Sequence, residues 1–175
     1  HPERVRRFVI LNTAAFPMPA GKRLPWQLMA CRNPFGALLV RGVNSFAKGA
    51  TRLCCTRRPM SVELQRLYLE PYDSWAHRIA VQRFVEDIPL KPGDKAYGLV
   101  AQTAETSAQF QDRPMLICWG EKDFVFDHCF LDEWLRRFPK AEVHRFLDSG
   151  HYVLEDAGEQ IIPLAKDFLA RHPIS

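Results

Sequence analysis

Apolar residues concentrate in three short runs that predict the strands of a buried parallel sheet. The longest, residues 115–120, is apolar without a break and closes with Gly120, a pattern typical of a strand covered on both faces. Residues 5–12 form a second candidate strand, and the alternation in residues 141–147 predicts a third strand nearer an edge. The sequence therefore predicts an α/β fold with a thin sheet, in which one flank of the first strand is uncovered.

A helical pattern of apolar residues lies between the expected strands 115–120 and 141–147, and another follows residues 141–147. A helix that begins near Asp127 would place Phe130 and Trp134 on one apolar face. A last helix is expected over residues 157–171, although Pro163 conflicts with an uninterrupted helix there. Strand–helix–strand units in this order form right-handed parallel crossovers.

Residues 17–90 predict a mainly helical insertion, because their prolines allow only short helical pieces. Helices are expected at residues 26–30, 35–50 and 61–69, and in a segment that runs from Trp75 to Val85. We therefore expect residues 1–16 to hold a core strand and residues 17–90 to form a helical cap. Residues 91–175 would complete the α/β core, with a polar-faced helix near residues 95–110.

Composition and charge narrow the class of protein. A chain of 175 residues with 47% hydrophobic and 25% charged residues is typical of a soluble globular domain. The net charge of +4 is too small and too scattered to indicate nucleic-acid binding, and no apolar run reaches the roughly 20 residues of a membrane helix. The five cysteines are odd in number and lack CxxC spacing, which favours a reducing, cytoplasmic location. We expect no disulfide framework, no metal and no cofactor.

Two ionisable residues follow expected strands at the ends where parallel sheets carry their chemistry. Asp123 lies just beyond the run that ends at Gly120, and His151 follows Gly150 after the third strand. Their separation of 28 positions (151 − 123) leaves room for one crossover helix. An acid and a histidine on neighbouring strand ends are the orienting half of a nucleophile–histidine–acid triad. The plainer alternatives are a turn or N-cap residue for Asp123 and a surface group for His151.

Several stretches are distinctive when they are taken in order: "RVRRFVILNTAAF", "RPMLICWGEKDFVFD" and "AEVHRFLDSGHYVLEDAGEQIIPLAKDFL". Together they resemble the C-terminal part of an α/β-hydrolase of the haloalkane-dehalogenase-like branch. The phrases "PYDSW", "RFVEDIPL" and "NTAAF" look most like the β-lactone decarboxylases of bacterial olefin biosynthesis. Those enzymes convert a cis-3-alkyl-4-alkyloxetan-2-one into an alkene and carbon dioxide. The resemblance implies that Asp123 is the triad acid and His151 the triad histidine.

The resemblance also implies a nucleophilic aspartate on a sharp elbow, located upstream of the strand that begins here at Arg4. No two of the nine glycines stand four positions apart, so the sequence has no Gly-x-[Ser/Asp]-x-Gly elbow. We therefore expect the chain to correspond to about the second half of such an enzyme. It would carry the acid and the histidine without the nucleophile and would be inactive alone.

Aromatic side chains in and near the expected cap are candidates for a pocket that takes long alkyl chains. These candidates are Trp26, Phe46, Trp75, Phe84 and Phe124, for each of which core packing is an equally simple explanation. Asn12 stands at the end of the first strand on the same side and is a further pocket candidate.

Three functional hypotheses remain open at this point. The first is part of a β-lactone decarboxylase with a hydrophobic, long-chain alkyl substrate and with other enzymes of the same pathway as partners. The second is part of a haloalkane dehalogenase or an epoxide hydrolase. The third is a non-catalytic protein that binds ligands or assembles with other proteins through the groove of the cap.

Overall fold

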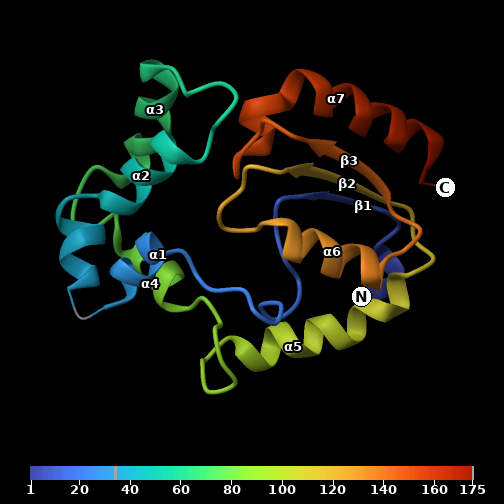
Figure 1. Cartoon of the computed structure of the whole chain (residues 1–175), viewed down its shortest axis with the longest axis horizontal. Coiled ribbons are helices and arrows are strands. Elements are labelled where there is room, and N and C mark those ends of the chain that lie inside the picture. Colours follow the sequence, from blue (N-terminus) through green and yellow to red (C-terminus); the bar gives the residue numbers. More distant parts are fainter. Residues whose placement is uncertain (34, 175) are drawn as a thin grey trace.

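Three parallel strands form the centre of the structure, a computed structural model that describes residues 1–33 and 35–174. The strands β1 (Phe8–Leu11), β2 (Met115–Gly120) and β3 (Glu142–Phe146) lie side by side in sequence order, with β2 in the middle (Figure 1). Ile10 of β1 is opposite Ile117 of β2. The predicted α/β fold with a partial parallel sheet is confirmed.

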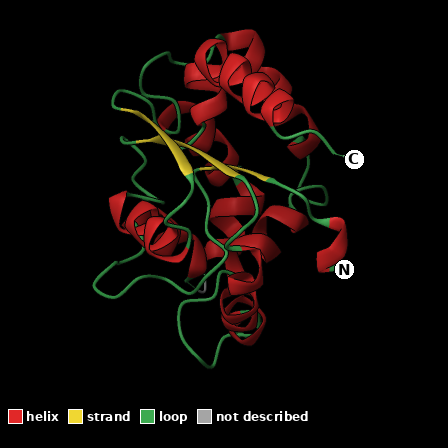
Figure 2. Ribbon diagram, turned by 90° about the vertical axis from the view of Figure 1, so that its right-hand side faces the viewer, coloured by secondary structure: helices red, strands yellow, loops and turns green. Residues whose placement is uncertain are grey.

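Every residue of β2 is buried because helices cover both faces of the sheet (Figure 2). Ile117 and Trp119 pack in the cluster that includes residues of α6 (His128–Arg137). Leu116 packs in the cluster that includes residues of α7 (Val153–Arg171). Burial of each large apolar side chain stabilises the fold by about 1.5–3 kcal/mol, so this strand anchors the two layers.

The two outer strands are shorter than expected and less covered. β1 spans Phe8–Leu11 rather than residues 5–12, and at its C-terminal end Asn12 adopts a positive φ of 25° that stops the extended backbone. One edge of β1 faces no neighbouring strand in the described residues, as the sequence predicted. Val9 on this strand is 39% exposed, so the flank of the sheet is partly open to solvent.

The ends of the two core helices follow local chemistry. Asp127, near which the sequence predicted a helix to begin, is the N-cap of α6, and its side chain accepts a hydrogen bond from the Cys129 backbone N–H. The last helix begins at Val153, earlier than expected, and is kinked at Ala157, whose φ of −135° is not helical. Pro163 lies in the longer piece after this kink, where its missing N–H leaves one carbonyl without its helical donor.

Four short helices lie beyond the carboxyl ends of the strands (Figure 1), within the stretch 17–90 that we call the cap segment. Their bounds are α1 Trp26–Arg32, α2 Ser45–Leu53, α3 Val62–Leu69 and α4 Ile79–Glu86. The prediction of a single helix over residues 35–50 is wrong. The chain forms a π-helical turn at Leu38–Gly42 and then α2, because Asn44 takes a left-handed φ of 56° that no continuous helix accommodates.

The rest of the cap segment and its link to the core also differ in detail from the expected helices. Trp75 precedes α4 rather than lying within it. The helix expected near residues 95–110 consists of α5 (Tyr97–Thr106) and a 3₁₀ turn at Ser107–Phe110. Further 3₁₀ turns occupy Pro2–Arg4 and Glu70–Tyr72. Among the described residues, no helix combines the length and the apolar character that crossing a bilayer requires.

Candidate active site

Asp123 and His151 meet beyond the carboxyl ends of β2 and β3. The Nδ1 atom of His151 lies 2.8 Å from Oδ2 of Asp123. The carboxylate side chain is completely buried, whereas the imidazole is 24% exposed. The backbone N–H of Lys122 donates to the carbonyl of Ser149 at 2.9 Å, which ties the turn that carries the acid to the turn that carries the histidine.

The carboxylate of Asp123 is held from two sides. Its Oδ1 accepts hydrogen bonds from the backbone N–H groups of Val125 and Phe126 at 2.7 and 3.0 Å. Its Oδ2 accepts from Nδ2 of Asn12 at 2.9 Å and faces His151. An ionised carboxylate can only accept, so Nδ1 of His151 carries the proton and Nε2 is left with a lone pair. The ring is therefore oriented as a base.

Asn12, expected as a pocket residue, lies beneath Asp123 and does not line the cavity described below. It is buried, and its side-chain oxygen accepts the Gly120 N–H at 2.7 Å while its amide donates to the Gly120 carbonyl at 3.1 Å. The end of β1 is thus joined to the end of β2. Asn12 therefore holds the carboxylate of Asp123 in place and is not the pocket residue that the sequence predicted.

Two glycines allow the backbones around the pair to approach closely. A Cβ atom on Gly120 would lie 2.4 Å from the carbonyl oxygen of Gly150. A Cβ atom on Gly150 would lie 2.5 Å from the carbonyl oxygen of Cys54 in the cap segment. Both distances are too short for any side chain, so the turns of Asp123 and His151 and the cap segment can pack this closely only with glycine at these positions.

A large, mainly apolar cavity of about 1470 Å³ lies between the sheet ends and the cap segment. His151 forms part of its wall. Four of the aromatic side chains expected to line a pocket do so, namely Trp26, Phe46, Phe84 and Phe124. Trp75 is not on its wall: the ring is 48% exposed, and the Arg41 guanidinium lies 4.5 Å from its centroid.

Cys54 lines this cavity together with His151, which raises the question of whether its thiol is a nucleophile. Burial and, to a smaller degree, the negative charge of Asp123 raise the pKa of Cys54 to about 12. The group therefore stays a neutral thiol at neutral pH. A cysteine nucleophile needs the opposite shift, so Cys54 is a wall residue rather than the third member of a triad.

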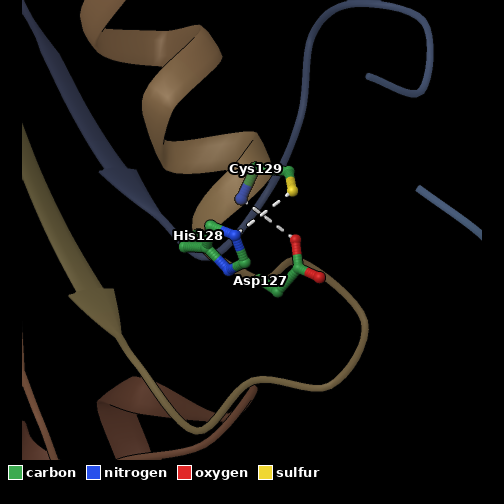
Figure 3. A group of neighbouring side chains, drawn as sticks. All are labelled: Asp127, His128 and Cys129. Carbon is green, nitrogen blue, oxygen red and sulfur yellow. Dashed lines mark hydrogen bonds between the residues drawn. The ribbon is translucent and has the colours of Figure 1, made fainter. Parts of the chain in front are cut away.

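Asp127, His128 and Cys129 bring three possible metal ligands together at the start of α6 (Figure 3). Both carboxylate oxygens of Asp127 already have other hydrogen-bond partners. The Lys22 ammonium donates to Asp127 Oδ2 at 2.7 Å, and the other oxygen caps the helix. A cation bound here would lie against the positive charge of Lys22, so we interpret the group as a capped helix end that also ties down the start of the cap segment.

Asp156 is a residue that the sequence analysis did not single out. It is fully buried in the first turn of α7 and accepts backbone hydrogen bonds from both the cap segment and the histidine turn. The only local signal is an acid in the first helical turn, which is common in helices with no such role.

The comparisons with known proteins agree with this fold. A family described as having the alpha/beta hydrolase fold matches residues 1–158. The chain is 49% identical over 170 residues to a cis-3-alkyl-4-alkyloxetan-2-one decarboxylase of Shewanella oneidensis, a match that covers 97% of the chain and 54% of that protein. A decarboxylase of the same description from Xanthomonas campestris is 44% identical over 175 residues, with 99% and 58% covered.

Solved structures of haloalkane dehalogenases share the fold. The dehalogenase DatA of Agrobacterium tumefaciens C58 superposes with a TM-score of 0.82 at 19% identity, covering 98% of this chain and 60% of that one. The chain thus spans little more than half the length of the relatives it matches. The chain belongs to the family of proteins with the α/β-hydrolase fold.

Proposed function

We propose that this chain supplies the acid and the base of the catalytic triad in an α/β-hydrolase-fold decarboxylase that acts on dialkyl β-lactones. The observation that carries the proposal is the contact of 2.8 Å between buried Asp123 and His151 on the wall of a large apolar cavity. A buried carboxylate that orients an imidazole towards an apolar chamber supports a catalytic pair over a structural ion pair.

The two side chains divide the work. Asp123 fixes the tautomer of His151 and stabilises the positive charge that the ring gains when it takes a proton. The lone pair on Nε2 is then free to take a proton from water or from the reacting intermediate. The carboxylate is already saturated by Asn12, Val125 and Phe126, so it does not reorganise during this step.

The attacking group is proposed to come from a part of the enzyme outside these 175 residues. Among the described residues, the outer edge of β1 has no neighbouring strand, and its backbone groups are available to one more parallel strand. A nucleophile at the carboxyl end of such a strand would reach the same edge of the sheet as Asp123 and His151.

The substrate class follows from the relatives and from the cavity. The relatives are named for a four-membered lactone with two alkyl groups, which a decarboxylase opens to an alkene and carbon dioxide. Here the aromatic rings of Trp26, Phe46 and Phe84 on the cavity wall offer apolar surface for such chains. The likeness to dehalogenases, at 19% identity, supports the fold alone.

An assay of alkene release tests the proposal. The chain would be studied alone and joined to the part of the Shewanella oneidensis decarboxylase that it does not cover, with a cis-dialkyl β-lactone as substrate and gas chromatography as readout. We expect alkene from the joined protein and none from the chain alone. In the joined protein, His151→Ala should lower kcat by about 10³-fold, because general base catalysis typically contributes 10²–10⁴-fold.

His144→Ala is the matched control. His144 lies on β3, where its Nε2 is 2.9 Å from a carboxylate oxygen of Glu142, and it is not on the cavity wall. Its removal should leave kcat unchanged. Alkene release by the chain alone would contradict the need for an outside nucleophile, and equal activity of the two variants would contradict the role of His151.

A further inference from the structure

The carboxylate of Asp156 joins two parts of the chain that are far apart in sequence. Its Oδ2 accepts the backbone N–H groups of Thr56 and Gly150, each at 2.7 Å, and its Oδ1 accepts the N–H of Arg58 at 3.0 Å. Two of these donors belong to residues 54–58 of the cap segment. The third belongs to the residue that directly precedes His151.

Other contacts between the same two segments strengthen this connection. The backbone N–H of Tyr152 donates to the carbonyl of Cys54 at 2.9 Å. The hydroxyl of Thr56 donates to the carbonyl of Asp148 at 2.6 Å. Both neighbours of His151 along the chain are therefore hydrogen-bonded, Gly150 to Asp156 and Tyr152 to the cap segment, which leaves the backbone at the histidine little freedom.

Side-chain contacts also connect the cap segment to the residues around His151. The ring of Tyr68, on cap helix α3, is stacked on Tyr152 with centroids 5.6 Å apart, and its hydroxyl donates to Glu155 at 2.6 Å. A cap helix thus contacts residues on both sides of the start of α7. Movement of this part of the cap would be passed to the turn that holds the histidine.

The charge on Asp156 is maintained although the side chain has no exposed surface. Burial by itself raises the pKa of Asp156, but the backbone N–H donors of Gly150, Thr56 and Arg58 outweigh it and lower the pKa below its ordinary value. The position in the first turn of α7 adds the favourable end of the helix dipole. The group is therefore an anion that accepts hydrogen bonds and cannot donate them.

We propose that Asp156 is a positioning residue that fixes His151 against Asp123 by tying the histidine turn to residues 54–58 of the cap segment. It does not contact the reacting atoms and acts through the backbone on either side of the histidine. The inference deepens the proposed function and rests on it. It adds that residues 54–58 of the cap segment and the turn that holds His151 are joined, so that a shift of the cavity wall would also move the base.

Proton NMR of the 175-residue chain tests this directly. A proton shared between His151 Nδ1 and the Asp123 carboxylate should give a low-field resonance, which Asp123→Asn identifies by removing it. Asp156→Asn replaces an acceptor oxygen with a donor NH₂ group and should abolish this resonance through exchange with water. Asp167→Asn, on the same helix at an exposed position paired with Arg171, is the matched control and should leave it unchanged.

The outcomes separate the two proposals. Loss of the resonance in Asp156→Asn, with a folded protein by circular dichroism, supports the inference, and an unchanged resonance overturns it. A wild-type chain whose low-field spectrum does not respond to Asp123→Asn overturns the proposed function and the inference with it. Should Asp156→Asn fail to fold, Asp156→Glu keeps the negative charge but displaces the carboxylate by one methylene from the N–H groups of Thr56, Arg58 and Gly150. A resonance that this folded variant leaves unshifted then overturns the inference.

Discussion

The sheet region, made of the three strands with α6 and α7, buries more of its large apolar side chains than the cap segment does. Leu116, Ile117 and Trp119 of the central strand have no exposed surface. In the cap segment, Trp26 is 75% exposed and Val62 is 81% exposed. The first region is stabilised by burial on two faces, whereas a cluster of buried residues among the described part of the second has three members, Cys31, Val40 and Val85.

This difference matches the division of labour at the site. The acid sits on the turn that follows the fully buried strand β2, whereas the base sits on the turn after the half-buried strand β3, and Asp156 ties that turn to residues 54–58 of the cap segment. The cavity wall comes mainly from the cap segment, which backbone hydrogen bonds such as that from Thr56 to Asp156 join to the core. Regions with few buried apolar contacts open at low free-energy cost, which suits a wall that admits a bulky substrate.

The largest expected effect comes from emptying the core of the sheet. Trp119→Ala should lower the free energy of unfolding by about 4 kcal/mol, because the fully buried indole leaves a cavity behind. Val85→Ala, in the small core of the cap segment, should cost about 2 kcal/mol, since only two methyl groups are lost. Urea denaturation followed by circular dichroism measures both, and equal losses would contradict the contrast between the regions.

The hydrogen bonds by which the Asp156 carboxylate joins the two regions should weaken in acid. Asp156 has a folded-state pKa below its ordinary value of 3.8, so the stability it contributes is present above that pH and is lost as the pH falls through the folded-state value. Asp156→Asn should lower the free energy of unfolding at neutral pH by about 3 kcal/mol, because buried N–H groups lose their acceptor. It should also flatten the acid limb of the stability profile.

Asp167→Asn serves again as the control, because its carboxylate is exposed and paired with Arg171 on the same helix. Urea midpoints measured across the acid range would show the difference. An acid limb equally steep in the wild type and in Asp156→Asn would mean that the other carboxylates with lowered pKa values, among them Glu133 and Glu142, dominate the acid response.

The sequence predicted the parts of the fold that depend on local pattern. The unbroken apolar run of β2 indicated a strand buried on both faces, and the helices expected to begin near Ser61 and Asp127 do so, each with that residue as its N-cap. The positions of Asp123 and His151 after neighbouring strands predicted that they would meet, and the structure brings them to 2.8 Å. Their catalytic roles stay a prediction.

The remaining features depend on contacts that no local pattern encodes. Asp156 binds N–H groups that lie 100 and 98 positions away in the sequence, and Asn12 binds Asp123 across 111 positions. In the sequence both appear as ordinary polar residues at the end of an element. The break at Asn44 had a signal, since asparagine tolerates the left-handed backbone, but the apolar spacing around it favoured a single helix.

A smaller effect is expected from the two buried asparagines with positive φ, one in each region. Asn12→Ala should cost about 2 kcal/mol, because the Gly120 N–H and the Asp123 carboxylate each lose a partner. Asn44→Ala, which removes one 3.2 Å bond to the Tyr72 carbonyl in the cap segment, should cost about 1 kcal/mol. Urea denaturation would rank the two.

The asparagine pair also separates stability from function. Only Asn12→Ala should weaken the low-field proton signal of the Asp123–His151 contact, since Asn44 touches neither side chain. A signal that survives Asn12→Ala unchanged would show that the backbone N–H groups of residues 125 and 126 orient the acid without help.

The smallest effect is expected where the cap segment is most exposed. Ser61 caps α3 by accepting the Leu64 N–H at 3.2 Å, and Ser61→Ala should cost about 1 kcal/mol. In an independently opening cap helix that loss should speed amide exchange across Val62–Leu69 about fivefold and leave β2 unaffected. Hydrogen–deuterium exchange with mass spectrometry measures both segments. If β2 exchanged faster as well, α3 would open only together with the sheet, because its contacts through Tyr68 would then be as strong as the core itself.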